Sequence, residues 1–189
     1  MKKVALATTL IILAAPALAH TGHGDAFGFL HGIAHPVLGP DHLLAMLAVG
    51  LWSGFALPRH LWAGAATFLA AMTAGAGLSW AGIAIPMVET WIVASVVLAG
   101  LLVATARAGQ ARALTAVSLG AIATFAACHG HAHATEATGS VATYLAGFLL
   151  STAGLHLAGL ALARGIGTGL LQKGLGAAIA GAGLLMLAG

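Results

Sequence analysis

Residues 86–106 read PMVETWIVASVVLAGLLVATA, a stretch in which Glu89 is the only charged side chain. About 20 apolar residues are needed for an α-helix to cross a membrane, so we interpret this stretch as a transmembrane helix. Similar apolar segments lie on both sides of it, at about 26–57, 61–80, 111–130, 139–163 and 170–188. The pattern predicts an all-α, polytopic integral membrane protein with about six transmembrane helices.

The composition excludes a soluble domain. Of the 189 residues, 60% are hydrophobic and only 6% are charged, and the mean hydropathy is +1.03. A soluble protein has about 25% charged residues, so lipid must cover most of this surface. The isoelectric point of about 9.6 does not indicate nucleic-acid binding, because the few basic residues lie between apolar segments. One cysteine, Cys128, excludes an intramolecular disulfide.

The N-terminus has the pattern of a secretory signal peptide. Residues 1–19 combine a basic start, a short apolar core and an Ala-x-Ala site that ends at Ala19. We expect cleavage there, which would leave residues 20–189 as a single transmembrane domain. An uncleaved membrane anchor is the alternative.

The first apolar segment, 26–57, is too long for one span. It contains Pro36, Gly39 and Pro40. Proline lacks a backbone donor and disfavours helix at the residue before it. We therefore predict a short outer helix, a break, and a true span from about residue 40. Small residues four apart, such as Ala71/Gly75 and Ala177/Gly181, predict close helix packing.

The basic residues predict the orientation. If export places the mature N-terminus outside, all of them fall in the three inner loops, as the positive-inside rule requires: Arg59, Arg107, Arg112, Arg164 and Lys173. We expect a bacterial inner-membrane protein with an even number of spans and both termini in the periplasm.

Two polar stretches carry candidate metal ligands, since ionisable groups within spans are costly and usually functional. Residues 31–46 read HGIAHPVLGPDHLLAM. In this stretch Asp41 and His42 open the first span, and His35 could fold back across the break. Imidazole and carboxylate together suit a divalent transition metal. The alternative is structural, because an aspartate at this position can cap a helix.

The second polar stretch, residues 125–136, reads FAACHGHAHATE. If it is helical, His129, His133 and Glu136 share one face, and His131 points away. This stripe could chelate a metal ion, or it could be a polar cap on the fourth span.

Other histidines extend the candidate set. His156 lies alone in the fifth span, roughly 12 Å from the inner end by the helical rise. It could be a deep ligand, or it could hydrogen-bond to a neighbouring helix. His20 and His23 at the mature N-terminus, with His31 and His131, could capture metal outside the membrane. A disordered polar tail is the alternative for the N-terminal pair.

These stretches resemble motifs of the HupE/UreJ family. The resemblance covers essentially the whole mature chain, and it rests on the HPVLGPDH sequence at 35–42, on residues 125–136 and on His156. Ala134 departs from the family pattern, which has glycine there. The resemblance implies a nickel permease, or in some members a cobalt permease, associated with hydrogenase or urease.

We therefore expect a permease that moves Ni(II) or Co(II) from periplasm to cytoplasm, within membrane lipid and without a catalytic cofactor. The chain has no nucleotide-binding motif, and a homo-oligomer is left open. One alternative is an accessory protein that binds metal without transporting it. An intramembrane enzyme is the weaker alternative, since Ser151 and His156 are five residues apart and no hydrolase motif occurs.

Overall fold

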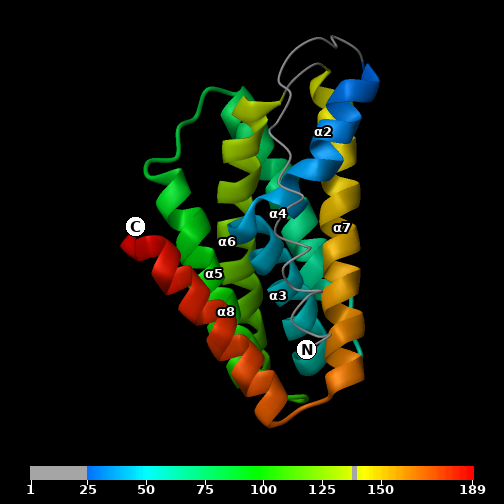
Figure 1. Cartoon of the computed structure of the whole chain (residues 1–189), viewed down its shortest axis with the longest axis vertical. Helices are drawn as coiled ribbons and strands as arrows, with labels where there is room; N and C mark the ends of the chain where they lie inside the picture. The colour runs from blue at the N-terminus through cyan, green and yellow to red at the C-terminus, as the bar shows by residue number, and fades with distance from the viewer. Residues whose placement is uncertain (1–24, 138–139) are drawn as a thin grey trace, which may run out of the picture.

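Seven α-helices form the part of the chain that the computed structural model describes, which is residues 25–137 and 140–189 (Figure 1). The helices are α2 (Asp25–Leu38), α3 (Pro40–Ala56), α4 (Ala63–Trp80), α5 (Val88–Thr105), α6 (Arg112–Glu136), α7 (Val141–Ile166) and α8 (Leu170–Ala188). The predicted all-α fold is confirmed. The predicted signal peptide, His20 and His23 lie outside the described residues.

Four of these helices, α5 to α8, are each long and apolar enough to cross a membrane. The bent pair of α2 and α3 provides a fifth span if its two parts are counted together. The remaining helix, α4, is rich in alanine and glycine, and it packs along α6. The expected number of about six spans corresponds to the helices α3 to α8.

The predicted break lies between α2 and α3, which meet at an angle of 79°. Gly39 is extended here, with φ −83° and ψ 114°, and Pro40 occupies the first turn of α3. Proline disfavours helix at the residue before it and suits the first helical position, so Pro40 both ends α2 and starts α3. Pro36 does not break the chain. It lies inside α2, which continues to Leu38.

Glycine brings the helices together in pairs. A methyl group on Gly130 would collide with the Met72 carbonyl, and one on Gly75 would collide with the Ala127 carbonyl, so α4 and α6 touch through their backbones. Comparable pairs join α5 to α8, α2 to α7 and α3 to α7: Gly100 and Gly176, Gly32 and Gly147, Gly50 and Gly159. The expectation is therefore right for Gly75, but Gly181 faces open space.

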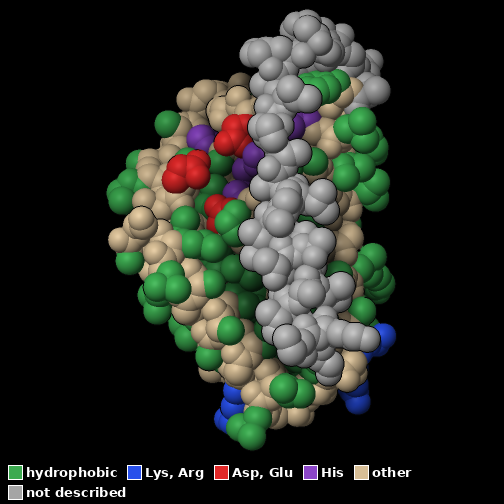
Figure 2. Space-filling model, in the orientation of Figure 1, with side chains coloured by type: hydrophobic (Ala, Val, Ile, Leu, Met, Phe, Trp, Pro, Cys, Tyr) green, Lys and Arg blue, Asp and Glu red, His purple; other side chains and the backbone are tan. Residues whose placement is uncertain are grey.

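Charge is divided between the two ends of the bundle. Histidine and acidic side chains gather in the upper half of the face shown in Figure 2, and lysine and arginine lie at its lower end. In the chain, α2 runs from the upper end into the bundle, and α3 continues toward the lower end (Figure 1). The break is therefore recessed within the bundle.

Candidate metal centre

The break in the chain places a histidine of α3 against a histidine of α6. His42 lies in the first turn of α3, and His133 lies in the last turns of α6. Their Nε2 atoms are in direct contact, although 91 positions separate the residues in the sequence. Both side chains are buried, with 6% and 5% of their surface exposed.

A carboxylate holds the other ring nitrogen of each histidine. His42 Nδ1 lies 2.6 Å from Asp41 Oδ1, and His133 Nδ1 lies 2.7 Å from Glu136 Oε2. An ionised carboxylate only accepts hydrogen bonds, so each Nδ1–H donates and each Nε2 keeps its lone pair. The two lone pairs therefore face each other, an arrangement that a shared cation stabilises. Carboxylate–histidine pairs of this kind orient the imidazole ligands of metal ions.

His35 brings a third imidazole from α2. One ligand atom each from His35, His42 and His133 lie within 4.8 Å of one another, close enough to hold one metal ion. His35 Nε2 is also 3.4 Å from Glu136 Oε2. Because α2 and α3 bend sharply at Gly39, residues only seven positions apart approach the same point from different directions.

Asp41 is not the N-cap residue of α3. The N-cap position is taken by Gly39, but Asp41 Oδ1 accepts from the His42 backbone N–H in the first turn, as well as from the His42 ring. A side chain on Gly39 would place a Cβ 2.9 Å from His42 Nδ1. Glycine at the break therefore leaves room for the His42 ring beside its carboxylate.

His129 lies next to these residues and is completely buried. Its ring is 4.9 Å from the ring of His42, and its Nδ1–H donates to the Phe125 carbonyl at 2.9 Å. That bond leaves the Nε2 lone pair of His129 buried and without a partner. The structure thus gathers six of the predicted ligands, which we call the histidine cluster: His35, Asp41, His42, His129, His133 and Glu136.

His156 lies apart from the histidine cluster. Its Nδ1–H donates to the Thr152 carbonyl at 2.6 Å, and its Nε2 is buried without a partner. The ring of Phe68 lies between the two regions, 5.6 Å from His129 and 5.0 Å from His156.

Comparison with known proteins assigns the family. The model of the family described as HupE / UreJ protein matches residues 8–186. The chain belongs to the HupE/UreJ family. A relative, Protein HupE from Rhizobium leguminosarum bv. viciae, is 40% identical over 195 residues, and the alignment covers 100% of both chains. No solved structure matches this HupE/UreJ chain.

Two of the histidines predicted to capture metal lie in the described part of this HupE/UreJ chain. The His31 ring lies 5.9 Å from that of His35 and 5.5 Å from that of Tyr144, so it adjoins the histidine cluster. His131 points elsewhere, and its Nε2–H donates to the Ile83 carbonyl at 2.7 Å. Its ring therefore joins α6 to the connection between α4 and α5.

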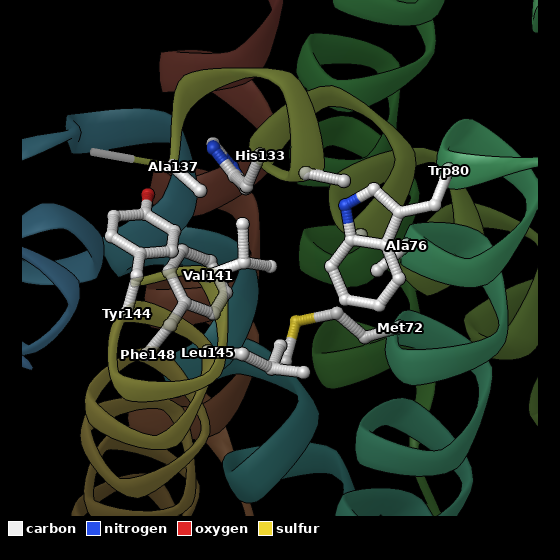
Figure 3. Close-up of a pocket in the computed structure, with 11 residues that line it drawn as sticks. Met72, Ala76, Trp80, His133, Ala137, Val141, Tyr144, Leu145 and Phe148 are labelled. Atoms are coloured by element: carbon white, nitrogen blue, oxygen red, sulfur yellow. The ribbon is translucent and has the colours of Figure 1, made fainter. Parts of the chain in front are cut away.

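An apolar pocket borders His133 between α4, α6 and α7 (Figure 3). Its walls include Met72, Trp80, Tyr144 and Phe148, and the ring of Phe148 is 4.8 Å from that of His133. An apolar wall keeps water from one side of the imidazole. Charge interactions within the HupE/UreJ site are therefore stronger than they would be in water.

Sequence reasoning missed two residues of this site. Phe68 looks like any apolar residue of a membrane helix, and only its position between His129 and His156 makes it notable. Glu89 lies in the first turn of α5, and its charge acts on His133. A carboxylate at the outer start of a span was the signal that could have identified Glu89.

Proposed function

We propose that this protein is a permease for a divalent transition-metal ion, with Ni(II) as its substrate and Co(II) as the alternative. It moves the ion from the periplasm to the cytoplasm across the bacterial inner membrane. The observation that carries this proposal is the pair of Nε2 lone pairs, on His42 and His133, which converge inside a membrane helix bundle.

Charge balance supports a dication as the substrate. Two carboxylates, Asp41 and Glu136, hold the neutral imidazoles of His42 and His133. An ion of charge +2 neutralises the two negative charges, whereas a monovalent cation leaves one of them unbalanced. Uncompensated charge is costly away from water, so the neutral combination is favoured.

The ligand types support a transition metal of intermediate softness. Imidazole and carboxylate accept Ni(II), Co(II), Zn(II) and Cu(II), and the lack of a thiolate disfavours Cu(I). Cys128 is buried against Ile92 and Ala132, in a separate apolar cluster. These ligands do not select nickel among the divalent ions, and the family resemblance supplies that choice.

Transport is favoured over simple binding because polar groups continue beyond the histidine cluster. His129 and His156 follow one another toward the lower end of the bundle, each with a buried, unpartnered Nε2. The basic residues at that end support its cytoplasmic assignment, which places both termini in the periplasm. An accessory protein that only binds metal has no need of these deeper groups. The proposal assigns no catalytic activity.

Uptake of Ni(II) into proteoliposomes that contain the purified full-length protein tests the proposal. We expect uptake by the wild type, none by His42→Ala, and wild-type uptake by His60→Ala, since His60 is exposed in the connection between α3 and α4. Tight Ni(II) binding by wild-type protein without any uptake would instead establish the accessory role.

A further inference from the structure

Two polar side chains outside the histidine cluster are buried without hydrogen-bond partners. Ser53 on α3 and His156 on α7 are only 1% and 2% exposed, and neither Ser53 Oγ nor His156 Nε2 has a partner. Burying such atoms unpaired costs free energy, so each one needs an explanation. The Nδ1–H of His156 already donates to Thr152, and its Nε2 is therefore a free acceptor.

Both side chains line one small cavity between α3, α4 and α7. Its volume of about 10 Å³ is the room that a single water or a small ion needs. Gly64 on α4 keeps the serine accessible, because a Cβ at this position would collide with Ser53 Oγ. The other walls are mainly apolar, and they include Leu61 and Leu160.

Phe68 separates this cavity from the histidine cluster. Its ring is packed between those of His129 and His156, and the side chain is only 2% exposed. The Phe68 ring therefore contacts both histidines and adjoins any route from His129 to His156.

We propose that Ser53 and His156 form a second binding site for the divalent ion, below Phe68. We call it the Ser53/His156 site, and it rests on the proposed permease function. Its protein ligands are His156 Nε2 and Ser53 Oγ, without a carboxylate. The site binds the ion weakly, as a release step requires, since conduction needs sites that the ion can leave.

Co(II) titration of the purified full-length protein tests this site without measuring transport. Visible absorption reports ligand binding, and calorimetry gives the number of ions bound. We expect wild-type protein to bind two equivalents, a tight one and a weak one. His156→Leu loses the weak equivalent and retains the tight one. Ser53→Ala removes only one oxygen atom, and it weakens the second equivalent without changing the first.

Gly64→Ala provides the sharpest comparison. Its methyl group covers the Ser53 hydroxyl, so it should weaken the second equivalent as Ser53→Ala does. Gly77→Ala is the matched control on the same helix, because its methyl group meets open space, and it should bind like the wild type. A second equivalent that is unchanged in His156→Leu, or a wild type that binds only one ion, would overturn the proposal.

Uptake measurements test the permease function, and ion-binding measurements test the Ser53/His156 site, so each can fail without the other. If the wild type takes up no Ni(II) but binds two equivalents of Co(II), with the weak one dependent on His156, the permease function fails and the Ser53/His156 site stands. If uptake occurs and only one ion binds, the permease function stands and the Ser53/His156 site is wrong.

Discussion

The histidine cluster and the surroundings of His156 use the same side chain in different ways. In the cluster, carboxylates accept from the Nδ1–H of His42 and His133. At His156, the acceptor is a backbone carbonyl of its own helix, which carries no net charge. A carboxylate raises the affinity of the imidazole for a cation, so the cluster is suited to capture and His156 to transfer.

The histidine cluster and the surroundings of His156 also differ in their backbone, which is broken in the first and regular in the second. The cluster is assembled at a helix break, where α2 and α3 meet at 79° and direct three histidines toward one point with the help of α6. Irregular backbone within a membrane is tolerated where protein or a cavity surrounds it. His156, by contrast, lies in the middle of the unbroken α7, so one helix supplies one ligand. A break therefore allows several ligands to converge, which a straight helix does not.

The largest effects are expected from changing Asp41 and His42, the pair of side chains at the break. His42→Ala removes a ligand, and Asp41→Asn retains the size of the side chain but removes its charge. Each should lower the initial rate of Ni(II) uptake about 100-fold or more, while the protein still inserts normally. Proteoliposome uptake at matched protein content measures this, with His60→Ala as the control. Wild-type uptake by Asp41→Asn would show that the carboxylate has only a structural role.

Lowering the pH should have the next largest effect on Ni(II) uptake. Neutral imidazole binds metal and imidazolium does not, so occupancy is complete at high pH and is lost as the pH falls. For an imidazole with the usual pKa of about 6.5, the neutral fraction falls about tenfold between pH 7.5 and 5.5. Burial of the cluster histidines disfavours the imidazolium form, so uptake should fall at lower pH than for an exposed imidazole. The measurement is the initial rate of uptake with equal pH on both sides of the membrane, and a rate that stays flat throughout the acid range in which the protein remains folded would count against histidine ligation at the rate-limiting step.

Glu136→Gln should have a smaller effect than Asp41→Asn. Glu136 is 45% exposed, whereas Asp41 is 22% exposed, so water screens the charge of Glu136 more strongly. The glutamine amide can still accept from His133 Nδ1–H. We expect Ni(II) affinity to fall about tenfold, measured by calorimetry. Thr135→Ala, at the neighbouring exposed position on α6, is the control, and equal losses in Glu136→Gln and Asp41→Asn would contradict this ranking.

The fold and most of the candidate site follow from local rules. Pro40 predicts the break because its effect acts on the adjacent residue. The stripe of His129, His133 and Glu136 follows from helical periodicity once α6 continues to Glu136. The apolar segment ends at about residue 130, but α6 continues to Glu136, so the polar residues after 130 belong to the same helix.

The remaining features depend on contacts between distant segments. The meeting of His42 and His133 requires the packing of α3 and α6, and nothing local in either sequence specifies it. The role of Phe68 depends on neighbours from two other helices. Pro36 shows the opposite case. Its local rule favours a break, but α2 continues past it to Leu38, so the rule does not decide where this helix ends.

The smallest effect is expected at Tyr144. Its hydroxyl is buried without a partner beside the histidine cluster, as His156 Nε2 is buried in the lower region. The two unpartnered atoms differ in their surroundings. The phenol ring lies in the wall of the apolar pocket of Figure 3, among Phe148 and Met72, whereas His156 shares its cavity with the polar Ser53. We therefore assign the ring of Tyr144 to packing and its hydroxyl to no ligand role.

Tyr144→Phe removes the hydroxyl and retains the ring contacts with His31 and Phe148. Removing an unpaired buried hydroxyl relieves a desolvation cost of about 1–3 kcal/mol, so thermal stability should stay equal or rise. Uptake should change less than about twofold, since this residue supplies neither charge nor a lone pair to the ion. The measurements are the initial uptake rate and the melting temperature of the purified protein. Loss of uptake with unchanged stability would make the hydroxyl a further ligand of the cluster, and the contrast with the Ser53/His156 site would then no longer hold.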